Sequence, residues 1–178
     1  MSSLFSLSKE GPLDKLKLYK ISENYIHFLR EIDPINVKFN KGERRPYVGV
    51  VFTIHQLSYF APLASPKPKH IHMKNSLDFV KIDNGKLGVI NLNNMIPVVS
   101  SALLELDIER EEEKYRNILY GQIRFINHHR EEICIKAKKL YLAVTEHHSY
   151  LERRCAKFKE LEQKSLCYLP IDKPPISP

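Results

Sequence analysis

Four side chains that could act on a phosphodiester lie close together in one proline-rich segment: Ser65, Lys67, Lys69 and His70. They supply a hydroxyl, two amines and an imidazole. Three prolines punctuate the segment from Tyr59 to His70, and proline fixes its own φ while it pushes the preceding residue toward an extended conformation. We therefore expect a stiff loop that presents these groups together. The alternative is a solvated turn, because most lysines in loops do no chemistry.

RNA is a substrate that such a loop could cleave, because RNA carries its own nucleophile, the 2′-hydroxyl. Cleavage needs a group that takes the 2′-proton, a cation near the phosphorane oxygens, and an acid or amine near the leaving 5′-oxygen. Side chains two residues apart in an extended segment start on the same side, so one phosphate could contact both Ser65 and Lys67. We expect Lys67 to neutralise the scissile phosphate, and Ser65 to hydrogen-bond the phosphate or relay the 2′-proton. None of these steps requires a metal ion.

Basic residues in an earlier loop could extend this surface. Arg44 and Arg45 end that loop, in which Lys41 adds a third cation, just before an apolar run that begins at Tyr47. Guanidinium groups form paired hydrogen bonds with phosphate oxygens, although a solvated turn is again the alternative. Taken together, the residues predicted to bind RNA are Lys41, Arg44, Arg45, Tyr47, Lys69, His70 and Phe125.

Phe125 and the histidines have two interpretations each. Phe125 lies about 100° around an expected helix from Ile126, the centre of the apolar stripe, so its ring could stack on a base or pack half-buried. His70 and His72 are two residues apart, as ligands on one strand face could be. No Asp, Glu or Cys residues accompany them at the spacings of a zinc site. We therefore expect no metal, and His70 fits better as an acid, a base or a phosphate contact.

The charge of the whole chain favours a polyanionic partner. The 178 residues carry a formal net charge of +7 and a sequence pI near 9.2, which favours nucleic acid first and an acidic membrane surface second. The three cysteines include no close C-x-x-C pair, so we expect reduced thiols in a cytoplasmic protein. No apolar run approaches the length of a transmembrane helix, and we expect no signal peptide.

Hydrophobic periodicity predicts strands in the first half of the chain and helices in the second. Ser22 is expected to cap a helix that ends before Pro34. A long amphipathic helix is expected from about Glu109, followed by a second over about 146–163 that could continue the first. The expected extended elements are strands over 17–21, 47–55 and 58–63, a hairpin over 79–92 around an Asn-Gly turn, and a piece from Ile96 onward.

Five segments of the chain carry a resemblance to a known family. Three are Tyr-Val-Gly-Val-Val-Phe from Tyr47, Tyr-Phe-Ala-Pro-Leu-Ala-Ser-Pro-Lys from Tyr59, and Leu-Gly-Val-Ile-Asn-Leu-Asn-Asn-Met-Ile-Pro-Val from Leu87. The flanking two are Leu-Tyr-Lys-Ile-Ser-Glu-Asn-Tyr-Ile-His-Phe-Leu from Leu18 and Tyr-Arg-Asn-Ile-Leu-Tyr-Gly-Gln-Ile-Arg-Phe-Ile-Asn from Tyr115. In this order and spacing they resemble the ToxN/AbiQ family, the endoribonuclease toxins of type III toxin–antitoxin and phage-abortive systems. The resemblance covers roughly residues 17–160.

The resemblance implies an α+β fold, a strongly bent antiparallel β-sheet of the Kid/MazF-like toxin type packed with long C-terminal helices. Residues 16–168 would form a single endoribonuclease toxin domain, with 1–15 a loosely ordered extension and 169–178 a proline-rich tail. In the family, the serine and lysine of a Ser-Pro-Lys motif belong to the active site, and both are present as Ser65 and Lys67. The family often has threonine before that serine, where this chain has Ala64.

The resemblance also bears on the expected RNA contacts. The family carries a functional basic residue just upstream of the strand at 47–55, and Arg45 corresponds to it best. It carries an aromatic hydroxyl a few residues earlier, where this chain has Lys41 or Gly42, so that contact is missing or replaced. An aromatic residue near the family's active site falls in the segment of Phe125.

The function implied is that of a metal-independent, cofactor-free, sequence-selective endoribonuclease that cuts cellular and phage messenger RNA. Its products would be a 2′,3′-cyclic phosphate and a 5′-hydroxyl. The implied antitoxin is a small repeated RNA that folds as a pseudoknot, is processed by the enzyme and alternates with it in a closed ring. Two alternatives stay open: a non-catalytic regulator that binds single-stranded RNA, and a Ser–Lys hydrolase acting on an acyl substrate. The hydrolase would need an oxyanion hole, and no glycine-rich turn adjoins Ser65.

Overall fold

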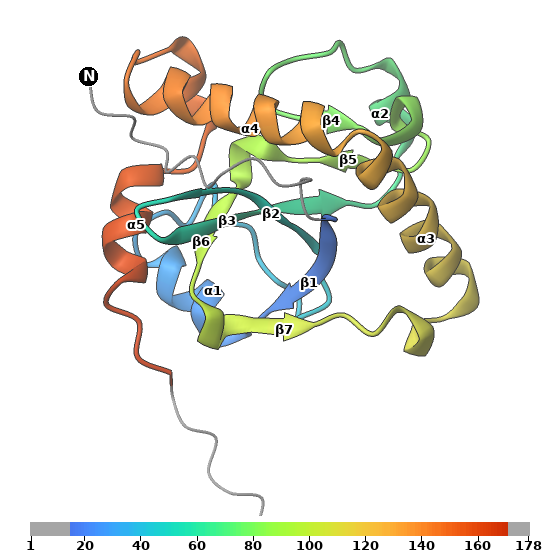
Figure 1. The fold of residues 1–178 in the computed structure, drawn as a ribbon, viewed down its shortest axis with the longest axis horizontal. Helices are drawn as coiled ribbons and strands as arrows, with labels where there is room; N and C mark the ends of the chain where they lie inside the picture. Colours follow the sequence, from blue (N-terminus) through green and yellow to red (C-terminus); the bar gives the residue numbers. More distant parts are fainter. Residues whose placement is uncertain (1–14, 171–178) are drawn as a thin grey trace, which may run out of the picture.

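The structure, a computed structural model, describes residues 15–170, and a seven-stranded β-sheet forms its centre (Figure 1). All strand pairings are antiparallel. Along the sheet the order is β4-β5-β3-β2-β1-β7, and β6 also pairs with β3. The strands are β1 Lys17–Ile21, β2 Tyr47–Ile54, β3 Leu57–Ala64, β4 Val80–Lys81, β5 Val89–Ile90, β6 Ile96–Val98 and β7 Leu103–Glu105.

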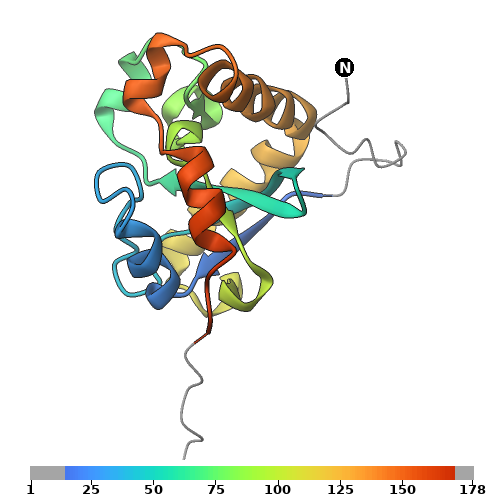
Figure 2. The same cartoon turned by 90° about the vertical axis from the view of Figure 1, so that its left-hand side faces the viewer.

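Helices cover this sheet and extend beyond its edge (Figures 1 and 2). In Figure 1, α4 crosses above the strands, α3 runs down the right side toward β7, and α5 stands at the left beside α1. The α-helices are α1 Glu23–Arg30, α2 Pro68–His72, α3 Glu113–His128, α4 Arg130–Thr145 and α5 Phe158–Ser165. Short 3₁₀ helices are η1 Ile82–Gly85, η2 Leu92–Asn94, η3 Ser100–Ala102, η4 Ile108–Arg110 and η5 Tyr150–Arg154. The expected α+β class, an antiparallel sheet packed with helices, is confirmed.

Local sequence signals explain the first half of the fold well. The Ser22 hydroxyl accepts a hydrogen bond from the Tyr25 backbone N–H at 3.2 Å, which caps α1 as expected. Strands β1, β2 and β3 fall where the apolar runs predicted them, and β4 pairs with β5 as the expected hairpin. The β2–β3 turn uses His55 and Gln56, both with positive φ. Short-range chemistry therefore determined these elements.

The second half of the fold corrects two expectations. The helix expected over about 146–163 is wrong: the chain leaves helix after Thr145, forms η5 and begins α5 only at Phe158. Ser149 caps η5, since its hydroxyl accepts from the Leu151 N–H, and the Ala156 N–H donates to the Asn93 carbonyl at 2.8 Å. The helix expected from about Glu109 starts at Glu113 and breaks at His129, between α3 and α4. Tertiary hydrogen bonds thus replaced helical ones.

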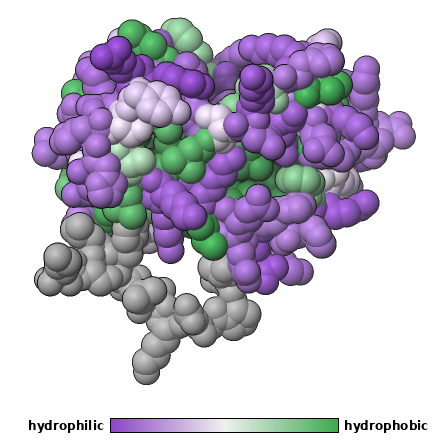
Figure 3. Space-filling model, turned by 90° about the horizontal axis from the view of Figure 1, so that it is seen from above, coloured by the Kyte–Doolittle hydropathy of each residue, from purple (hydrophilic) through white to green (hydrophobic). Residues whose placement is uncertain are grey.

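Aromatic side chains form the core between the sheet and helices α4 and α5. The rings of Phe52 and Tyr59 stack with centroids 4.5 Å apart. Tyr141 from α4 and Phe158 from α5 pack against Tyr59 at 5.7 Å and 6.0 Å. Such pairs add to the free energy gained by burying the rings. On the outside, Figure 3 shows mostly hydrophilic side chains, with hydrophobic groups scattered among them.

The chain is anchored at the start of the described region. Leu16 is buried, and its backbone N–H and carbonyl both bond the side-chain amide of Asn127, each at 2.9 Å. Residues 1–14 and 171–178, which make up most of the expected extension and tail, lie outside the described residues. Within residues 15–170, each helix is too short or too polar to cross a lipid bilayer.

Candidate active site

The segment that leaves β3 presents the two residues expected to be catalytic. Ser65 and Lys67 are both exposed, and Pro66 between them is half-buried. Lys67 has extended backbone angles, φ −141° and ψ 146°. Two side chains separated by one residue in extended backbone start on the same side of the chain. The hydroxyl and the amine are therefore available together to one substrate group.

A short helix follows directly, where a loop was expected. Pro68 opens α2 at a position that favours proline, because the first helical N–H has no partner within the helix. The His70 N–H donates to the Lys67 carbonyl at 2.9 Å. At the other end, the Lys81 ammonium donates to the carbonyls of Ile71 at 2.8 Å and Met73 at 3.1 Å. Lys67 thus lies at the junction of an extended segment with a helical turn capped at its far end.

Two glycines of the β4–β5 turn lie in close contact with the two ends of the segment from Ala64 to His70. A Cβ atom on Gly88 would lie 2.1 Å from the Ala64 carbonyl oxygen, and one on Gly85 would lie 2.5 Å from the His70 carbonyl oxygen. Both glycines have positive φ, +97° and +90°, which L-residues with a Cβ adopt only with strain. The Asn-Gly turn of the sequence therefore packs closely against the backbone at Ala64 and at His70.

Helix α3 packs against the β4–β5 turn. The Gln122 side-chain amide donates to the Leu87 carbonyl at 2.8 Å. A Cβ on Gly121 would lie 2.9 Å from the Leu87 Cδ1 atom, so the helix approaches the turn closely. Phe125 is one helical turn beyond Gly121 on the same face, half-buried, with its ring 4.3 Å from that of His129. The structure places Phe125 at the flank of the apolar stripe, as its phase predicted.

The basic loop reaches the same end of β3. The Leu63 N–H donates to the Pro46 carbonyl at 2.9 Å, and Tyr47 pairs with Pro62. Arg45 is therefore one residue away from a backbone contact with β3, which Ser65 follows directly. The sheet thus brings together two stretches that the sequence separates by about twenty residues.

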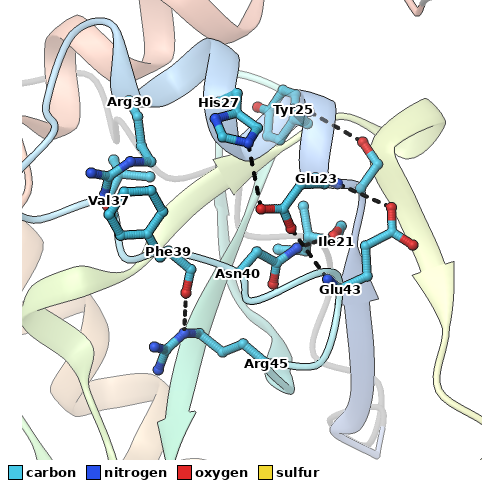
Figure 4. A network of polar contacts seen from close by, with 11 residues as sticks. Ile21, Glu23, Tyr25, His27, Arg30, Val37, Phe39, Asn40, Glu43 and Arg45 are labelled. Carbon is cyan, nitrogen blue, oxygen red and sulfur yellow. Dashed lines mark hydrogen bonds and ion pairs between the residues drawn. The ribbon is translucent and has the colours of Figure 1, made fainter.

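The two arginine side chains of this loop donate hydrogen bonds to backbone carbonyls of the same loop. The Arg45 Nε donates to the Phe39 carbonyl at 2.9 Å (Figure 4). The Arg44 Nε donates to the Lys41 carbonyl, also at 2.9 Å. Arg44 and Lys41 are exposed, and Arg45 is half-buried. The three cations expected to contact RNA therefore lie on one ordered loop beside the end of β3.

Tyr47 and His70 are placed differently from the other expected RNA contacts. Tyr47 is 1% exposed and His70 is 3% exposed, so each ring lies beneath the surface and direct contact with RNA is blocked. Burial raises the pKa of the Tyr47 hydroxyl. Burial, reinforced by the charges of Lys69 and Lys67, lowers the pKa of His70, which favours the neutral imidazole. Within the described residues, the His70 Nδ1 atom makes no hydrogen bond. Lys69 beside it is exposed.

A cavity of about 480 Å³ lies between β1, β7 and α3. Tyr19, half-buried in its wall, pairs with Tyr47 across the sheet and packs edge-on against Phe60 at 5.4 Å. Tyr19 was not among the residues expected to act on RNA. The sequence pattern that could have indicated it is the period of two along β1, which places Tyr19 on the same face of the strand as Lys17. The lining residues are Lys17, Leu18, Tyr19, Leu103, Leu104, Glu105, Leu106, Ile108 and Ile123.

The histidines do not assemble a metal site in the described part of the chain. His70 is buried and His72 is exposed, both within α2 instead of on one strand face. Among residues 15–170, no group of three His, Cys, Asp or Glu side chains comes together as metal ligands. A second cavity, of about 350 Å³, lies at the α3–α4 junction and is lined by His128, His129, Arg130, Glu131 and Glu132.

Comparison with known proteins gives a consistent result. The family model for toxin ToxN of type III toxin–antitoxin systems matches residues 17–165. The curated Endoribonuclease ToxN of Bacillus thuringiensis subsp. kurstaki is 35% identical over 162 residues, covering 85% of this chain and 83% of its own. The Endoribonuclease AbiQ of Lactococcus lactis subsp. lactis is 28% identical over 179 residues, covering 94% and 96%.

Solved structures agree with the sequence relatives. One, from a study of selective toxin inhibition by a non-coding RNA pseudoknot, superposes with a TM-score of 0.76 at 35% identity, over 86% of this chain and 97% of its own. The lactococcal anti-phage endoribonuclease AbiQ superposes with a TM-score of 0.76 at 26% identity, over the same shares of the two chains. The resemblance found in the sequence is thus confirmed: the chain belongs to the ToxN toxin family of type III toxin–antitoxin systems, whose matched curated members are endoribonucleases.

Proposed function

We propose that this chain is a toxin that cleaves single-stranded RNA by attack of a 2′-hydroxyl on the adjacent phosphate. The products are a 2′,3′-cyclic phosphate and a 5′-hydroxyl, and no metal ion takes part. The observation that carries the proposal is the exposed pair Ser65 and Lys67 on a segment held at both ends by Gly85 and Gly88, in a chain of the ToxN family. A nuclease of this kind needs a rigid cation and a hydroxyl at one phosphate more than it needs a deep pocket.

Each group has a defined task in this mechanism. The Lys67 ammonium meets the charge that develops on the phosphorane oxygens, which is where a fixed cation lowers the barrier most. The Ser65 hydroxyl hydrogen-bonds the phosphate or relays the 2′-proton. Arg45, beside the end of β3, holds a neighbouring phosphate and so helps to align the 2′-oxygen for in-line attack. Because the glycine turn fixes the segment in advance, little reorganisation accompanies the reaction.

The same surface is proposed to bind the antitoxin. Two solved relatives come from studies of toxin inhibition by a non-coding RNA pseudoknot and of a processed non-coding RNA that regulates an antiviral system. By extension, a repeated RNA folds as a pseudoknot over the site of this chain, is cut into units by it, and alternates with it in a closed ring. Cellular and phage messenger RNAs are the substrates of the released toxin in the cytoplasm. The net charge of +7 supports both interactions.

Replacement of the two key side chains tests the catalytic proposal. We expect Lys67→Met and Ser65→Ala each to lower the rate of RNA cleavage by roughly 100-fold or more, and to relieve growth inhibition, while the thermal unfolding midpoint stays unchanged. Exposed Lys139 on α4 offers a matched control, Lys139→Met, which removes one positive charge from a helix outside the segment from Ala64 to His70. Undiminished cleavage by Ser65→Ala and Lys67→Met would reject the assigned roles. RNA binding without cleavage by the wild-type chain would favour the non-catalytic regulator.

The chemical route is tested by the ends of the products and by chelation. We expect cleavage to continue in excess EDTA, and the 3′ ends to resist a polynucleotide ligase that requires a free 3′-hydroxyl until a cyclic phosphodiesterase and a phosphatase have acted. Loss of activity in EDTA that added Mg²⁺ restores would overturn the metal-independent route. Products with 5′-phosphates would overturn attack by the 2′-hydroxyl.

A further inference from the structure

The ring of Phe39 forms an exposed aromatic surface in the loop between α1 and β2. Its side chain is 57% exposed, and the guanidinium carbon of Arg30 lies 3.6 Å from the ring centroid (Figure 4). Because the guanidinium covers one face, the exposed area belongs to the other face and the ring edge. Two further cation–π contacts, of Lys159 and Lys164, fall on rings that are buried or half-buried. Phe39 instead presents its ring to solvent.

The backbone on both sides of Phe39 is fixed to the core. Val37 and Asn40 are each fully buried, at 0% exposure. The Arg30 guanidinium donates to the Val37 carbonyl, and the Asn40 side-chain amide donates to the Ile21 carbonyl. Phe39 therefore stands between two anchored residues. An exposed aromatic ring that is held this firmly loses little conformational freedom when a flat ligand stacks on it.

The charges around the ring suit a polyanion. The carboxylates of Glu23, the first residue of α1, and of Glu43 in the loop accept hydrogen bonds from backbone groups: the Glu23 N–H donates to Glu43 at 3.1 Å, and the Glu43 N–H donates to Glu23 at 3.2 Å (Figure 4). The cations near Phe39 in the chain are Arg30, Lys38, Lys41, Arg44 and Arg45. An aromatic face set among cations matches the alternation of base and phosphate in a single strand.

Phe39 is also connected to the candidate active site. Its carbonyl accepts the hydrogen bond of the Arg45 Nε at 2.9 Å. Arg45 is followed by Pro46, whose carbonyl accepts from the Leu63 N–H at 2.9 Å, close before Ser65. A path of hydrogen bonds and backbone contacts thus runs from the Phe39 carbonyl through Arg45 and Pro46 to the end of β3. A strand of RNA held at Ser65 and Lys67 can continue along this path.

We propose that Phe39, backed by Arg30, is a base-stacking site for single-stranded RNA that lies beside the scissile phosphate. A nucleobase rests on the open face of Phe39, and Arg45 contacts the phosphate between that base and the cleaved link. Arg30 prevents the ring from turning and places positive charge behind it. The site rests on the proposed function, because RNA is its occupant, and it extends that function by assigning where a neighbouring base is held.

A fluorescent reporter tests the stacking directly. The chain has no tryptophan, so Phe39→Trp introduces a single one, and Lys67→Met in the same chain prevents cleavage during the titration. We expect its fluorescence to fall when a single-stranded oligoribonucleotide binds, and to stay nearly constant when an abasic oligonucleotide of the same length binds. Tyr150→Trp, at a position that is 78% exposed in η5, reports any quenching that does not depend on the site.

The RNA affinities of two further Phe39 variants distinguish stacking on an aromatic ring from simple filling of space. Phe39→Tyr should bind the oligonucleotide like the wild-type chain, whereas Phe39→Leu should weaken binding about tenfold or more, because leucine fills space without a π-face. Equal binding by the leucine variant, or equal quenching by the abasic oligonucleotide, would overturn the site.

If RNA quenches the Phe39→Trp reporter but the wild-type chain cuts no RNA, the proposed function fails and the stacking site stands. If the wild-type chain cuts RNA and no quenching occurs, the stacking site alone fails.

Discussion

Strand β3 carries a buried polar group, whereas the segment that follows it carries exposed ones. Near the N-terminal end of β3, the Tyr59 hydroxyl donates to the Glu162 carboxylate at 2.8 Å, and the Tyr141 hydroxyl donates to the same oxygen at 2.6 Å, all within the core. Just past its C-terminal end, Ser65 and Lys67 are exposed on a braced segment. The polar atoms of a buried cluster must be hydrogen-bonded, because an unpaired buried polar atom destabilises the fold. The exposed groups are held in place by backbone packing and stay accessible to a substrate.

Under the proposed function, the buried cluster contributes to stability and the exposed segment contributes to catalysis. The Glu162 cluster joins β3, α4 and α5, so its loss should affect folding. The Ser65 segment is shaped by Gly85 and Gly88, so distortion of that turn should affect the chemistry. Variants that act on one region and spare the other therefore test the comparison.

Among the variants that compare the two regions, the largest effect is expected from Gly88→Ala. The new Cβ would lie 2.1 Å from the Ala64 carbonyl oxygen at a backbone φ of +97°. We expect RNA cleavage to fall by about 100-fold, because a displacement of about 1 Å at a reacting group has an effect of that order. The free energy of unfolding should fall by more than about 2 kcal/mol. Denaturant titration and initial cleavage rates measure the two effects.

A second glycine provides the control for this variant. Gly42 also has positive φ, +67°, but no atom lies within 4 Å of the position that a Cβ would take there. Gly42→Ala should therefore lose only the backbone contribution of about 1–2 kcal/mol. Equal loss of stability in the two variants would show that the contact with Ala64 is unimportant.

The next effect is expected from Glu162→Leu. Two buried tyrosine hydroxyls would lose their shared acceptor, and each such loss destabilises a fold by about 1–3 kcal/mol. We expect the free energy of unfolding to fall by roughly 2–5 kcal/mol, with little change in the cleavage rate measured well below the unfolding temperature. Exposed Glu160 on the same helix is the matched control, and Glu160→Leu should change stability by less than about 0.5 kcal/mol. A cleavage defect as large as that of Gly88→Ala would refute the division of roles.

The smallest effect is expected from His70→Gln, as a function of pH. Burial and the charges of Lys69 and Lys67 lower the pKa of His70 from its ordinary 6.5. The unfolded chain therefore takes up a proton before the folded one does, so stability is fully present above about pH 6.5 and is lost as pH falls toward the lower folded value. Between about pH 7.5 and about pH 5.5, the wild-type chain should lose more free energy of unfolding than His70→Gln.

Denaturant midpoints at the two pH values measure this difference. Exposed His128 gives the matched control, His128→Gln. If wild-type and His70→Gln lost the same free energy on acidification, the buried imidazole would have no influence on stability.

The local chemistry of the chain explains which parts of the fold were predictable. Ser22 caps α1 because its hydroxyl accepts from the N–H three residues later, and β2 and β3 are apolar runs that follow each other in the chain and pair with each other. The Asn-Gly turn could be predicted for the same reason. The family itself was recognisable from five short segments, and the comparisons confirm it.

Other features depended on contacts between distant residues. The end of α4 follows from Ser149 and from the bond between Ala156 and Asn93, which no periodicity encodes. Tyr47 and His70 were expected to contact RNA, and both side chains are buried in the folded chain. The chemical types of the residues were visible in the sequence, but the depth at which each one lies was not.

The amino-acid sequence alone was enough to predict strands β1 to β3, the cap of α1 and membership of the ToxN family, because apolar runs, capping residues and short motifs can each be recognised within a few consecutive residues. The folded chain adds three arrangements: Arg45 lies beside the end of β3, Gly85 and Gly88 contact the Ser65 segment, and the Phe39 ring packs against Arg30. These arrangements arise when the strands pair and bring separated loops to one end of the sheet. Spacing along the chain cannot specify them.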